Sequence, residues 1–149
     1  MVRVLIKKLN PSVQLPSYKT NGASGMDLMA FTEKPINLEP GKSCLVSTGL
    51  SVAFPEEYEI QIRPRSGLAA KSNISVLNTP GTIDSDYRGE LKIILFNHGT
   101  KKFIINNNDR VAQMVFTPII KMELEETNEL PESIRGEGGF GSTGKWRIF

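Results

Sequence analysis

Polar side chains that could recognise or act on a ligand gather in the segment 77–91, which reads L-N-T-P-G-T-I-D-S-D-Y-R-G-E-L. It holds two carboxylates, an amide and a phenol, contributed by Asp84, Asp86, Asn78 and Tyr87. Asn78 carries both a donor and an acceptor, so with nearby main-chain N–H and C=O groups it can pair with the edge of a planar heterocycle. An ordinary turn, in which Asp and Asn bond their own backbone, explains the same residues. The segment alone leaves both interpretations open.

A second group suited to chemistry is R-P-R-S-G-L-A-A-K at 63–71. Arg65 offers a planar, permanently charged donor fork that matches phosphate oxygens. Ser66 and the N–H of Gly67 stand where a turn becomes a short helix, and free N–H groups at a helix start favour anions. A capped helix with solvated arginines fits these residues equally well.

Two further segments each place a polar residue among apolar ones. Asp27 lies in S-G-M-D-L-M-A at 24–30, where an unpaired carboxylate is costly, so it needs a partner, a cation or water. Gln113 lies in N-D-R-V-A-Q-M-V-F at 108–116. The structural alternatives are an Asp27 that bonds its own turn and a Gln113 that faces solvent from a strand. Asp109 and Arg110 are expected to pair with each other or with neighbours.

Near the C-terminus, R-G-E-G-G-F-G-S-T-G at 135–144 combines glycines with residues that are poor choices for a spacer. Phe140 is an aromatic ring that can stack over a base, a contact worth about 1–3 kcal/mol. Glycine-rich backbone, such as that around Gly141, can wrap phosphates closely. Arg135 and Ser142 are equally unusual in a spacer. The ordinary interpretation of such composition is a disordered tail.

Short runs of apolar and β-branched residues, separated by Gly, Pro, Asn and Ser, predict the strands that must position these groups. Pro80 and Gly81 turn the chain between strands on either side of 77–91, which predicts a hairpin. Only 66–72 favours a helix, with Ser66 as its N-cap. The expected strands are 2–6, 26–31, 44–54, 58–62, 91–96, 103–105, 111–120 and 122–124, with a further strand ending near Leu77.

This pattern predicts an all-β fold, either a sandwich, a jelly roll or a barrel, with one short helix. The chain of 149 residues is long enough for one domain that buries about two-thirds of its unfolded surface. We expect that domain at 1–130. The shift to polar and glycine-rich composition after it predicts a flexible C-terminal arm at 131–149, outside the core.

Composition argues against several classes of function. The 18 basic and 16 acidic residues nearly balance, which disfavours bulk binding to nucleic acid. No run approaches the roughly 18 apolar residues of a membrane span, and no signal peptide is expected. Cys44 is the only cysteine, so a reducing compartment such as the cytoplasm is expected. Cys44 and His98 are the only soft ligands and lie far apart in sequence, which disfavours a zinc hydrolase.

Together the five segments resemble the signature motifs of the trimeric dUTP pyrophosphatases (dUTPases), in the family's order and over nearly the whole chain. P-R-S-G-L-A at 64–69 matches the second motif without a mismatch, and 78–91 matches the third. Ser24 replaces alanine in the first motif. Asn108 replaces glycine in the fourth, where both residues tolerate positive φ. The resemblance implies a distorted, jelly-roll-like β domain assembled as a homotrimer, in which each site collects motifs from more than one subunit and the arm comes from a neighbour.

The resemblance also implies an activity, the hydrolysis of dUTP to dUMP and pyrophosphate, which keeps uracil out of DNA and supplies dUMP for thymidylate synthesis. Asp84 matches the residue that orients and deprotonates the water attacking the α-phosphorus. Asp27 matches the residue that holds waters around a Mg²⁺ ion without binding the metal directly. The residues expected to contact the triphosphate are Arg65, Ser66, Gly67, Gln113 and Arg135, with Gly141 and Ser142 of the arm.

The third motif is expected to select the base. Main-chain groups at Gly81, Thr82 and Ile83, completed by Asn78, would leave buried groups unpaired with cytosine, at about 1–3 kcal/mol each. A close-packed turn at 81–83 would leave no room for the methyl group of thymine.

Sugar selection and closure of the site are expected from residues that follow the base-binding turn. Tyr87 would lie under the sugar and exclude a 2′-hydroxyl, while the backbone of Lys92 could reach the base. The arm, with Phe140 over the base, would close as a lid that excludes water other than the nucleophile. Asp86, Arg88 and Glu90 are expected to serve the turn or the packing of subunits.

Two other functions fit parts of the sequence. A dCTP deaminase is similar in fold and nucleotide class, but Ile94 stands near the position of its catalytic glutamate and cannot carry a proton. A non-catalytic β module that binds nucleotides or partner proteins would need neither Asp84 nor a complete arm. Hydrolysis of dUTP separates both from the dUTPase interpretation.

Overall fold

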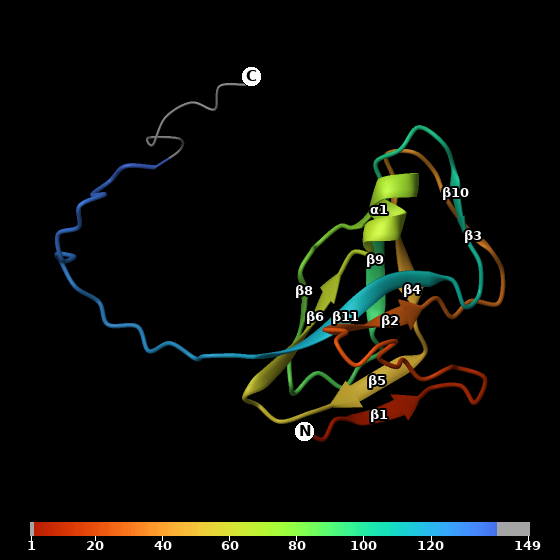
Figure 1. Cartoon of the computed structure of the whole chain (residues 1–149), viewed down its shortest axis with the longest axis horizontal. Coiled ribbons are helices and arrows are strands. Elements are labelled where there is room, and N and C mark those ends of the chain that lie inside the picture. The colour runs from red at the N-terminus through yellow and green to blue at the C-terminus, as the bar shows by residue number, and fades with distance from the viewer. Residues whose placement is uncertain (1, 140–149) are drawn as a thin grey trace.

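Strands account for most of the regular structure in the computed structural model, which describes residues 2–139 (Figure 1). One helix, α1 (Ser66–Ser72), interrupts them. The strands are β1 (Leu5–Lys8), β2 (Gly25–Met29), β3 (Ile36–Leu38), β4 (Ser43–Ser47), β5 (Leu50–Ala53), β6 (Tyr58–Arg63), β7 (Ile74–Val76), β8 (Gly81–Ile83), β9 (Lys92–Asn97), β10 (Phe103–Ile105) and β11 (Arg110–Pro118).

The strands pair into four antiparallel sheets. The largest has the order β2-β11-β6-β8, and a second has the order β4-β9-β7. The pairs β1-β5 and β10-β3 complete the fold. The expected mostly β fold with one short helix is therefore confirmed, although the sheets do not join into a closed barrel.

Most expected strands form, and the differences have physical reasons. The run 44–54 divides into β4 and β5, because the chain turns at Gly49, whose φ of 68° is costly for other residues. The short β3 was missed, since three residues carry too little periodicity. The prediction of a strand at 122–124 is wrong: those residues are irregular and pair with no strand among residues 2–139.

A single apolar core lies between the sheets. In β9, Ile93, Leu95 and Asn97 are buried while the alternate residues are more accessible, as the period of a half-buried strand requires. Asn97 is fully buried, and its amide is fully satisfied. Its Nδ2 donates to the carbonyls of Leu38 and Lys101, each at 2.9 Å, and its Oδ1 accepts the N–H of Gly99 at 2.8 Å. These bonds fix the end of β9 against β3.

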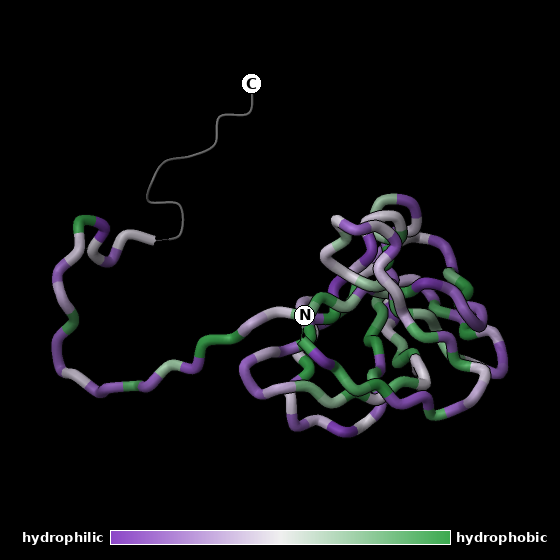
Figure 2. The backbone as a smooth tube through the Cα atoms, turned by 60° about the horizontal axis from the view of Figure 1, so that its bottom comes forward, coloured by the Kyte–Doolittle hydropathy of each residue, from purple (hydrophilic) through white to green (hydrophobic). Residues whose placement is uncertain are grey.

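Beyond β11 the chain leaves the sheets and extends away from them, as both overall views show (Figures 1 and 2). The described part of this segment contains no helix or strand after Pro118. Ile120, Met122 and Leu124 are 97%, 81% and 84% exposed. No helix within residues 2–139 is long and apolar enough to cross a membrane.

Candidate active site

The four-stranded sheet brings together four of the five polar segments singled out in the sequence. Strands β2, β11 and β8 lie in the segments 24–30, 108–116 and 77–91, and β6, which pairs with β11 and β8, leads into the segment 63–71 at Arg63. Asp27 of β2 lies opposite Gln113 of β11, and Gln113 lies opposite Arg63 of β6. In the next row, Ile62 lies opposite Gly81. Antiparallel pairing thus aligns residues that are far apart in the chain.

Asp27 is held by two arginines. Arg65 Nε lies 2.7 Å from Oδ1 and Nη2 lies 3.4 Å from Oδ2, so the contact is bidentate. Arg110 Nη1 lies 3.3 Å from Oδ2. The Asp27 and Arg65 side chains are only 20% and 28% exposed, which makes this pair stronger than a surface ion pair. The carboxylate in the apolar strand has therefore found cationic partners.

Arg65 keeps donors available for a ligand after these contacts. Its Nη1 also donates to the carbonyl of Arg110 at 3.1 Å. A guanidinium has five N–H groups, and three are used here within the described residues. Two N–H groups remain for an anion, with the plane of the fork already fixed by Asp27.

Gln113 is anchored beside this pair. Its Nε2 donates to the carbonyl of Pro64 at 2.9 Å. A Cβ on Gly25 would lie 2.8 Å from the Gln113 Oε1 and 3.2 Å from the carbonyl oxygen of Met114, so a side chain there would have to move the glutamine amide. The glycine at position 25 thus leaves room for Gln113 in its present position.

The second segment differs from expectation at its helix start. Arg65, with φ −93° and ψ 129°, is the N-cap of α1, and no side-chain hydrogen bond caps the helix. Ser66 is the first helical residue, so the prediction that it caps the helix is wrong. Ser66 and Gly67 are both exposed, next to the guanidinium that precedes them.

The expected hairpin is confirmed, since β7 and β9 pair directly on either side of the segment 77–91. Within it, however, residues 81–83 form strand β8, which pairs with β6 in the other large sheet. The prediction of a close-packed turn at 81–83 is therefore wrong. The hairpin loop instead joins the two large sheets.

Asn78 lies against the start of β8. A Cβ on Gly81 would be 3.2 Å from Asn78 Nδ2 and 3.3 Å from Ile62 Cβ, so only glycine leaves the amide where it is. Asn78 and Thr82 are exposed, and Ile83 is half-buried. The amide and the adjacent main chain thus remain open to a ligand on one side of β8.

Tyr87 is fixed by its own loop. Its hydroxyl donates to the carbonyl of Glu90 at 3.0 Å, and its N–H donates to the carbonyl of Asp84 at 3.1 Å. The ring lies over Gly89, where a Cβ would collide with it. Tyr87 is 43% exposed, so one face of a well-held ring stays accessible.

Asp84 follows β8 and is exposed. Because β8 runs antiparallel to β6, Ile83 lies opposite Ile60, three residues from Arg63 along β6. At about 3.3 Å per residue, that separation is about 10 Å. One chain therefore does not bring Asp84 beside the Asp27–Arg65 pair.

The remaining expected residues are dispersed. Lys92 begins β9, lies opposite Ser47, and its Nζ is 3.6 Å from Glu90 Oε2. Arg135 is exposed, and its Nε donates to the carbonyl of Gly138 within its own turn, so it does not meet the residues on the sheet. Phe140, Gly141 and Ser142 lie outside the described residues.

Sequence reasoning missed what two residues do. Arg110 was expected to pair with Asp109 or another neighbour, and it reaches Asp27, 83 residues away in the chain. Glu90 was expected to serve the turn or the packing of subunits, and it binds the corner between β4 and β5 of its own chain. The position of Asp27 in an apolar strand was a signal for the role of Arg110, because a carboxylate there requires cationic partners.

The described residues contain no group of three or more His, Cys, Asp or Glu side chains arranged to hold a metal ion. Asp27 still fits a role in which it contacts a cation through a water molecule. A carboxylate has about four lone-pair positions, and the arginines occupy three of them. One position remains to accept a water molecule of a hydrated ion.

The soft side chains show no catalytic arrangement. Cys44 is half-buried in β4, and burial raises the pKa of its thiol, which keeps it protonated at neutral pH. His98 lies elsewhere, with Nε2 2.7 Å from Ser75 Oγ and its ring against Phe96.

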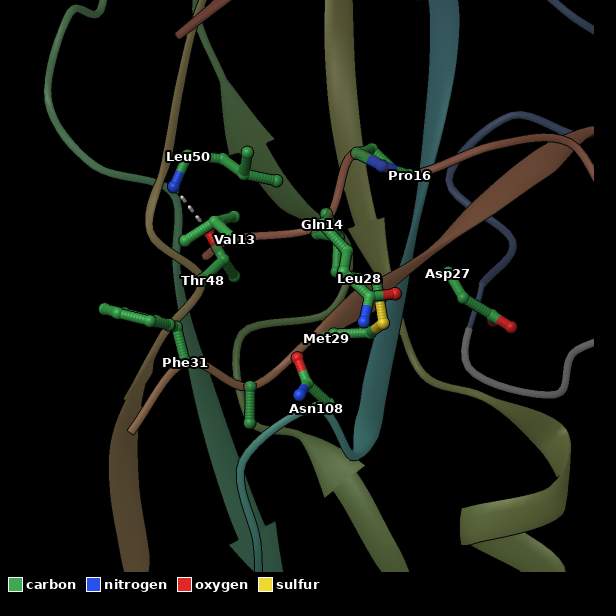
Figure 3. Close-up of a pocket in the computed structure, with 11 residues that line it drawn as sticks. Val13, Gln14, Pro16, Asp27, Leu28, Met29, Phe31, Thr48, Leu50 and Asn108 are labelled. Carbon is green, nitrogen blue, oxygen red and sulfur yellow. Dashed lines mark hydrogen bonds between the residues drawn. The ribbon is translucent and has the colours of Figure 1, made fainter. Parts of the chain in front are cut away.

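A small pocket borders the back of β2, between that strand and residues 13–16 (Figure 3). Apolar side chains such as Leu28 and Phe31 line it together with polar groups, and Thr48 Oγ1 accepts the N–H of Leu50 at 3.3 Å within it. The Asp27 carboxylate points away from this pocket, toward the side of α1 (Figure 3). The candidate site therefore lies on the other side of β2, at the arginines.

The protein-family model described as dUTPase matches residues 12–144 of this chain. Among similar proteins is a deoxyuridine 5′-triphosphate nucleotidohydrolase of Clostridium tetani, 54% identical over 140 residues, which are 94% of this chain and 95% of that protein. Another of the same name, from a Hydrogenobaculum species, is 51% identical over 143 residues, which are 96% of this chain and 99% of that protein.

Solved structures show the same fold. A dUTPase mutant from staphylococcal phage 80alpha is 26% identical, with a TM-score of 0.83, covering 94% of this chain and 98% of that one. A dUTPase mutant from phage phi11 of S. aureus is 22% identical, with a TM-score of 0.78, covering 87% of this chain and 99% of that one. The phi11 protein is described as coordinating a structural Mg(II) ion.

Proposed function

The chain belongs to the dUTPase family, and from this premise we propose how its residues divide the hydrolysis of dUTP to dUMP and pyrophosphate. Asp84 accepts a proton from a water molecule as that water attacks the α-phosphorus. A bond forms between the water oxygen and the α-phosphorus, and the bond to the oxygen that bridges to the β-phosphorus breaks. Pyrophosphate leaves with the electron pair of that bond.

One observation carries this proposal: a single sheet aligns Asp27 with Gln113 on neighbouring strands, Arg65 binds Asp27 just after β6, and the Asn78 loop enters the same sheet through β8. The sheet supplies a phosphate-binding group and a base-binding group in fixed positions. Positioning supplies most of the rate in phosphoryl transfer, because the transition state needs charge stabilisation and alignment more than covalent help.

The uracil ring binds against the Asn78 amide and the main chain of residues 81–83. The Asn78 amide lies close to Gly81, which has no side chain to displace it, so it can complete the pattern of donors and acceptors that the main chain offers. Cytosine presents an amine where uracil presents O4, and a rigid pattern would leave that amine and its partner unpaired.

The triphosphate binds at Arg65. The two N–H groups that Asp27 and the Arg110 carbonyl leave unused point to a ligand that accepts several hydrogen bonds from one fork. Ser66 and Gly67 follow in the chain, and Gln113 lies beside Pro64 to contact the α-phosphate. Arg135, Phe140, Gly141 and Ser142 of the arm complete the enclosure.

Mg²⁺ is the proposed cofactor, and when bound to the triphosphate it would neutralise charge on the phosphate oxygens. The free lone-pair position of Asp27 suits a water molecule of the hydrated ion better than the ion itself. The two guanidinium groups already balance the charge of this carboxylate, which weakens its attraction for a bare cation.

A homotrimer with shared sites is the proposed assembly. Within one chain Asp84 is remote from Arg65, although the reaction needs the nucleophile and the phosphate-binding cation at one triphosphate. A neighbouring subunit can supply the missing group, and the extended segment after Pro118 can reach that subunit. With one half-buried cysteine and no requirement for a disulfide, a reducing compartment such as the cytoplasm is proposed.

Pyrophosphate release from dUTP, dTTP, dCTP and UTP, measured side by side with and without Mg²⁺, tests the proposed function. We expect rapid release from dUTP alone and a strong loss when Mg²⁺ is removed. Ammonia release from dCTP would instead indicate a deaminase, although the apolar side chain of Ile94 disfavours it. No turnover of any of the four nucleotides would leave only a binding module.

A further inference from the structure

Glu90 lies outside the groups assigned to the reaction, yet its two ends connect the sugar-selecting ring to the core. Its backbone carbonyl accepts the Tyr87 hydroxyl at 3.0 Å. Its side chain turns inward, where Oε1 accepts the N–H of Gly49 at 2.8 Å. The side chain is only 19% exposed, unusual for a glutamate on a loop.

Glu90 binds the main chain at a tightly packed corner. Gly49 has a φ of 68°, and a Cβ there would press on Val13 and Phe31, so the corner between β4 and β5 requires glycine at this position. Leu91 N–H donates to the carbonyl of Leu50 at 2.8 Å. Thr48 Oγ1 in turn donates to the carbonyl of Leu91 at 2.6 Å. The chain just after the ring is thereby tied to the core at two successive residues.

Between this anchor and the ring there is little other support. Gly89 leaves space for the ring to lie flat over the backbone, but it adds no side chain to hold it. The Tyr87 hydroxyl has one hydrogen bond within the described residues, and that bond goes to Glu90. The position of the Tyr87 ring therefore depends on the position of the Glu90 carbonyl.

From this arrangement we propose that Glu90 is a positioning residue for sugar selection, which acts by fixing Tyr87 against the β4–β5 corner. The inference rests on the proposed function, in which Tyr87 excludes the 2′-hydroxyl of a ribonucleotide. Without the bond to Gly49, the peptide that carries the Glu90 carbonyl keeps the Leu91 N–H bond to Leu50 as its remaining anchor, and residues 87–90 shift away from the sugar. The space that opens admits UTP, while the phosphate-binding residues on the sheet stay in place.

The test compares Glu90→Ala with Glu90→Gln, using kcat and KM for dUTP and for UTP. Glutamine keeps an oxygen to accept the Gly49 N–H, so Glu90→Gln should retain the wild-type ratio of kcat/KM for dUTP over UTP. Glu90→Ala should lower that ratio about tenfold or more, chiefly through better use of UTP. Glu57→Ala, which removes an exposed glutamate, is the matched control and should leave the ratio unchanged.

A Glu90→Ala enzyme that loses activity on both nucleotides equally, with the ratio intact, would overturn the inference, since that is the effect of a purely structural residue. Equal loss of the ratio in Glu90→Gln and Glu90→Ala would also overturn it, because the acceptor oxygen would then be irrelevant. Tyr87→Ala separates this inference from the proposed function. If Tyr87→Ala lowers the ratio and Glu90→Ala does not, only the role of Glu90 fails; if neither does, Tyr87 does not select the sugar.

Discussion

The carboxylate of Asp27 and the guanidinium of Arg65 form a two-point ion pair, with Nε 2.7 Å from Oδ1 and Nη2 3.4 Å from Oδ2. Asp27 lies in β2, whereas Arg65 follows the end of β6 as the N-cap of α1, and the two lie 38 positions apart in the chain. The residue proposed to hold the water of a metal ion therefore also sets the direction of the proposed phosphate-binding cation. In this proposal, metal binding and phosphate binding are coupled through one carboxylate.

Replacing that carboxylate should damage catalysis more than folding. In Asp27→Asn, Arg65 keeps a neutral partner but loses the charge that fixes its plane, so kcat/KM for dUTP should fall about 10- to 100-fold. The free energy of unfolding should fall by only about 1 kcal/mol, because solvent and Arg110 can compensate in part. Initial rates and urea denaturation measure the two effects. Glu57→Gln, an exposed carboxylate replaced in the same way, is the control; an Asp27→Asn enzyme as active as this control would remove Asp27 from the site.

Two inactive variants should restore each other if sites are shared. One chain carries Asp84→Asn, and the other ends before Arg135 and so lacks the arm. Refolding the two together should return a measurable fraction of the pyrophosphate release from dUTP, because some sites then combine an intact Asp84 with an arm from another subunit. Each variant refolded alone is the control. If the mixture stays as inactive as its components, the arm serves its own chain.

The glycine beneath Tyr87 should be intolerant of a methyl group. A Cβ at position 89 would lie 2.8 Å from Cε2 of the ring, so Gly89→Ala must push Tyr87 out of place. We expect kcat/KM for dUTP to fall about tenfold through misalignment of the sugar. Gly22→Ala is the matched control, because nothing lies within 4 Å of its Cβ. Similar kinetics for both variants would show that the ring position does not matter.

Cys44 should react slowly while the protein is folded. Burial raises the pKa of its thiol above the ordinary value of 9.0, so the unfolded thiol ionises first as the pH rises. The stability that this group contributes is complete below pH 9 and is lost as the pH rises through the folded pKa. Labelling by a thiol reagent at pH 8 should be much slower in buffer than in urea. Above pH 9 the wild type should lose stability relative to Cys44→Ser; parallel pH curves for the two would contradict the assignment.

Most of the strands could be predicted from the sequence, because the alternation of buried and exposed residues along a strand is local information. It also identified Asp27, Asn78, Tyr87 and Asp84 as unusual polar residues. The sequence could not predict which strands pair with one another. The hairpin loop contains β8, which pairs with β6. Its three residues, one of them a buried glycine, resemble a turn when the neighbouring strand is unknown. Tertiary pairing overrode local turn chemistry there.

The same limit applied to side-chain roles. The need of Asp27 for a cation could be read from its apolar neighbours, but the choice of Arg65 and Arg110 depends on the register of three strands. Glu90 resembled a turn residue because its partner, the N–H of Gly49, lies 41 positions away. Ser66, by contrast, matched the pattern of an N-cap residue, but the N-cap of α1 is Arg65, one residue earlier.

The role of Asp84 is the central claim, and Asp84→Asn tests it most directly. Pyrophosphate release from dUTP and the Kd for a non-hydrolysable dUTP analogue should be measured on the same preparation. The account predicts that turnover falls by about 100-fold or more, because the amide cannot take the proton, while the Kd stays within about threefold of wild type. Turnover near the wild-type value, or a loss of analogue binding as large as the loss of turnover, would contradict it.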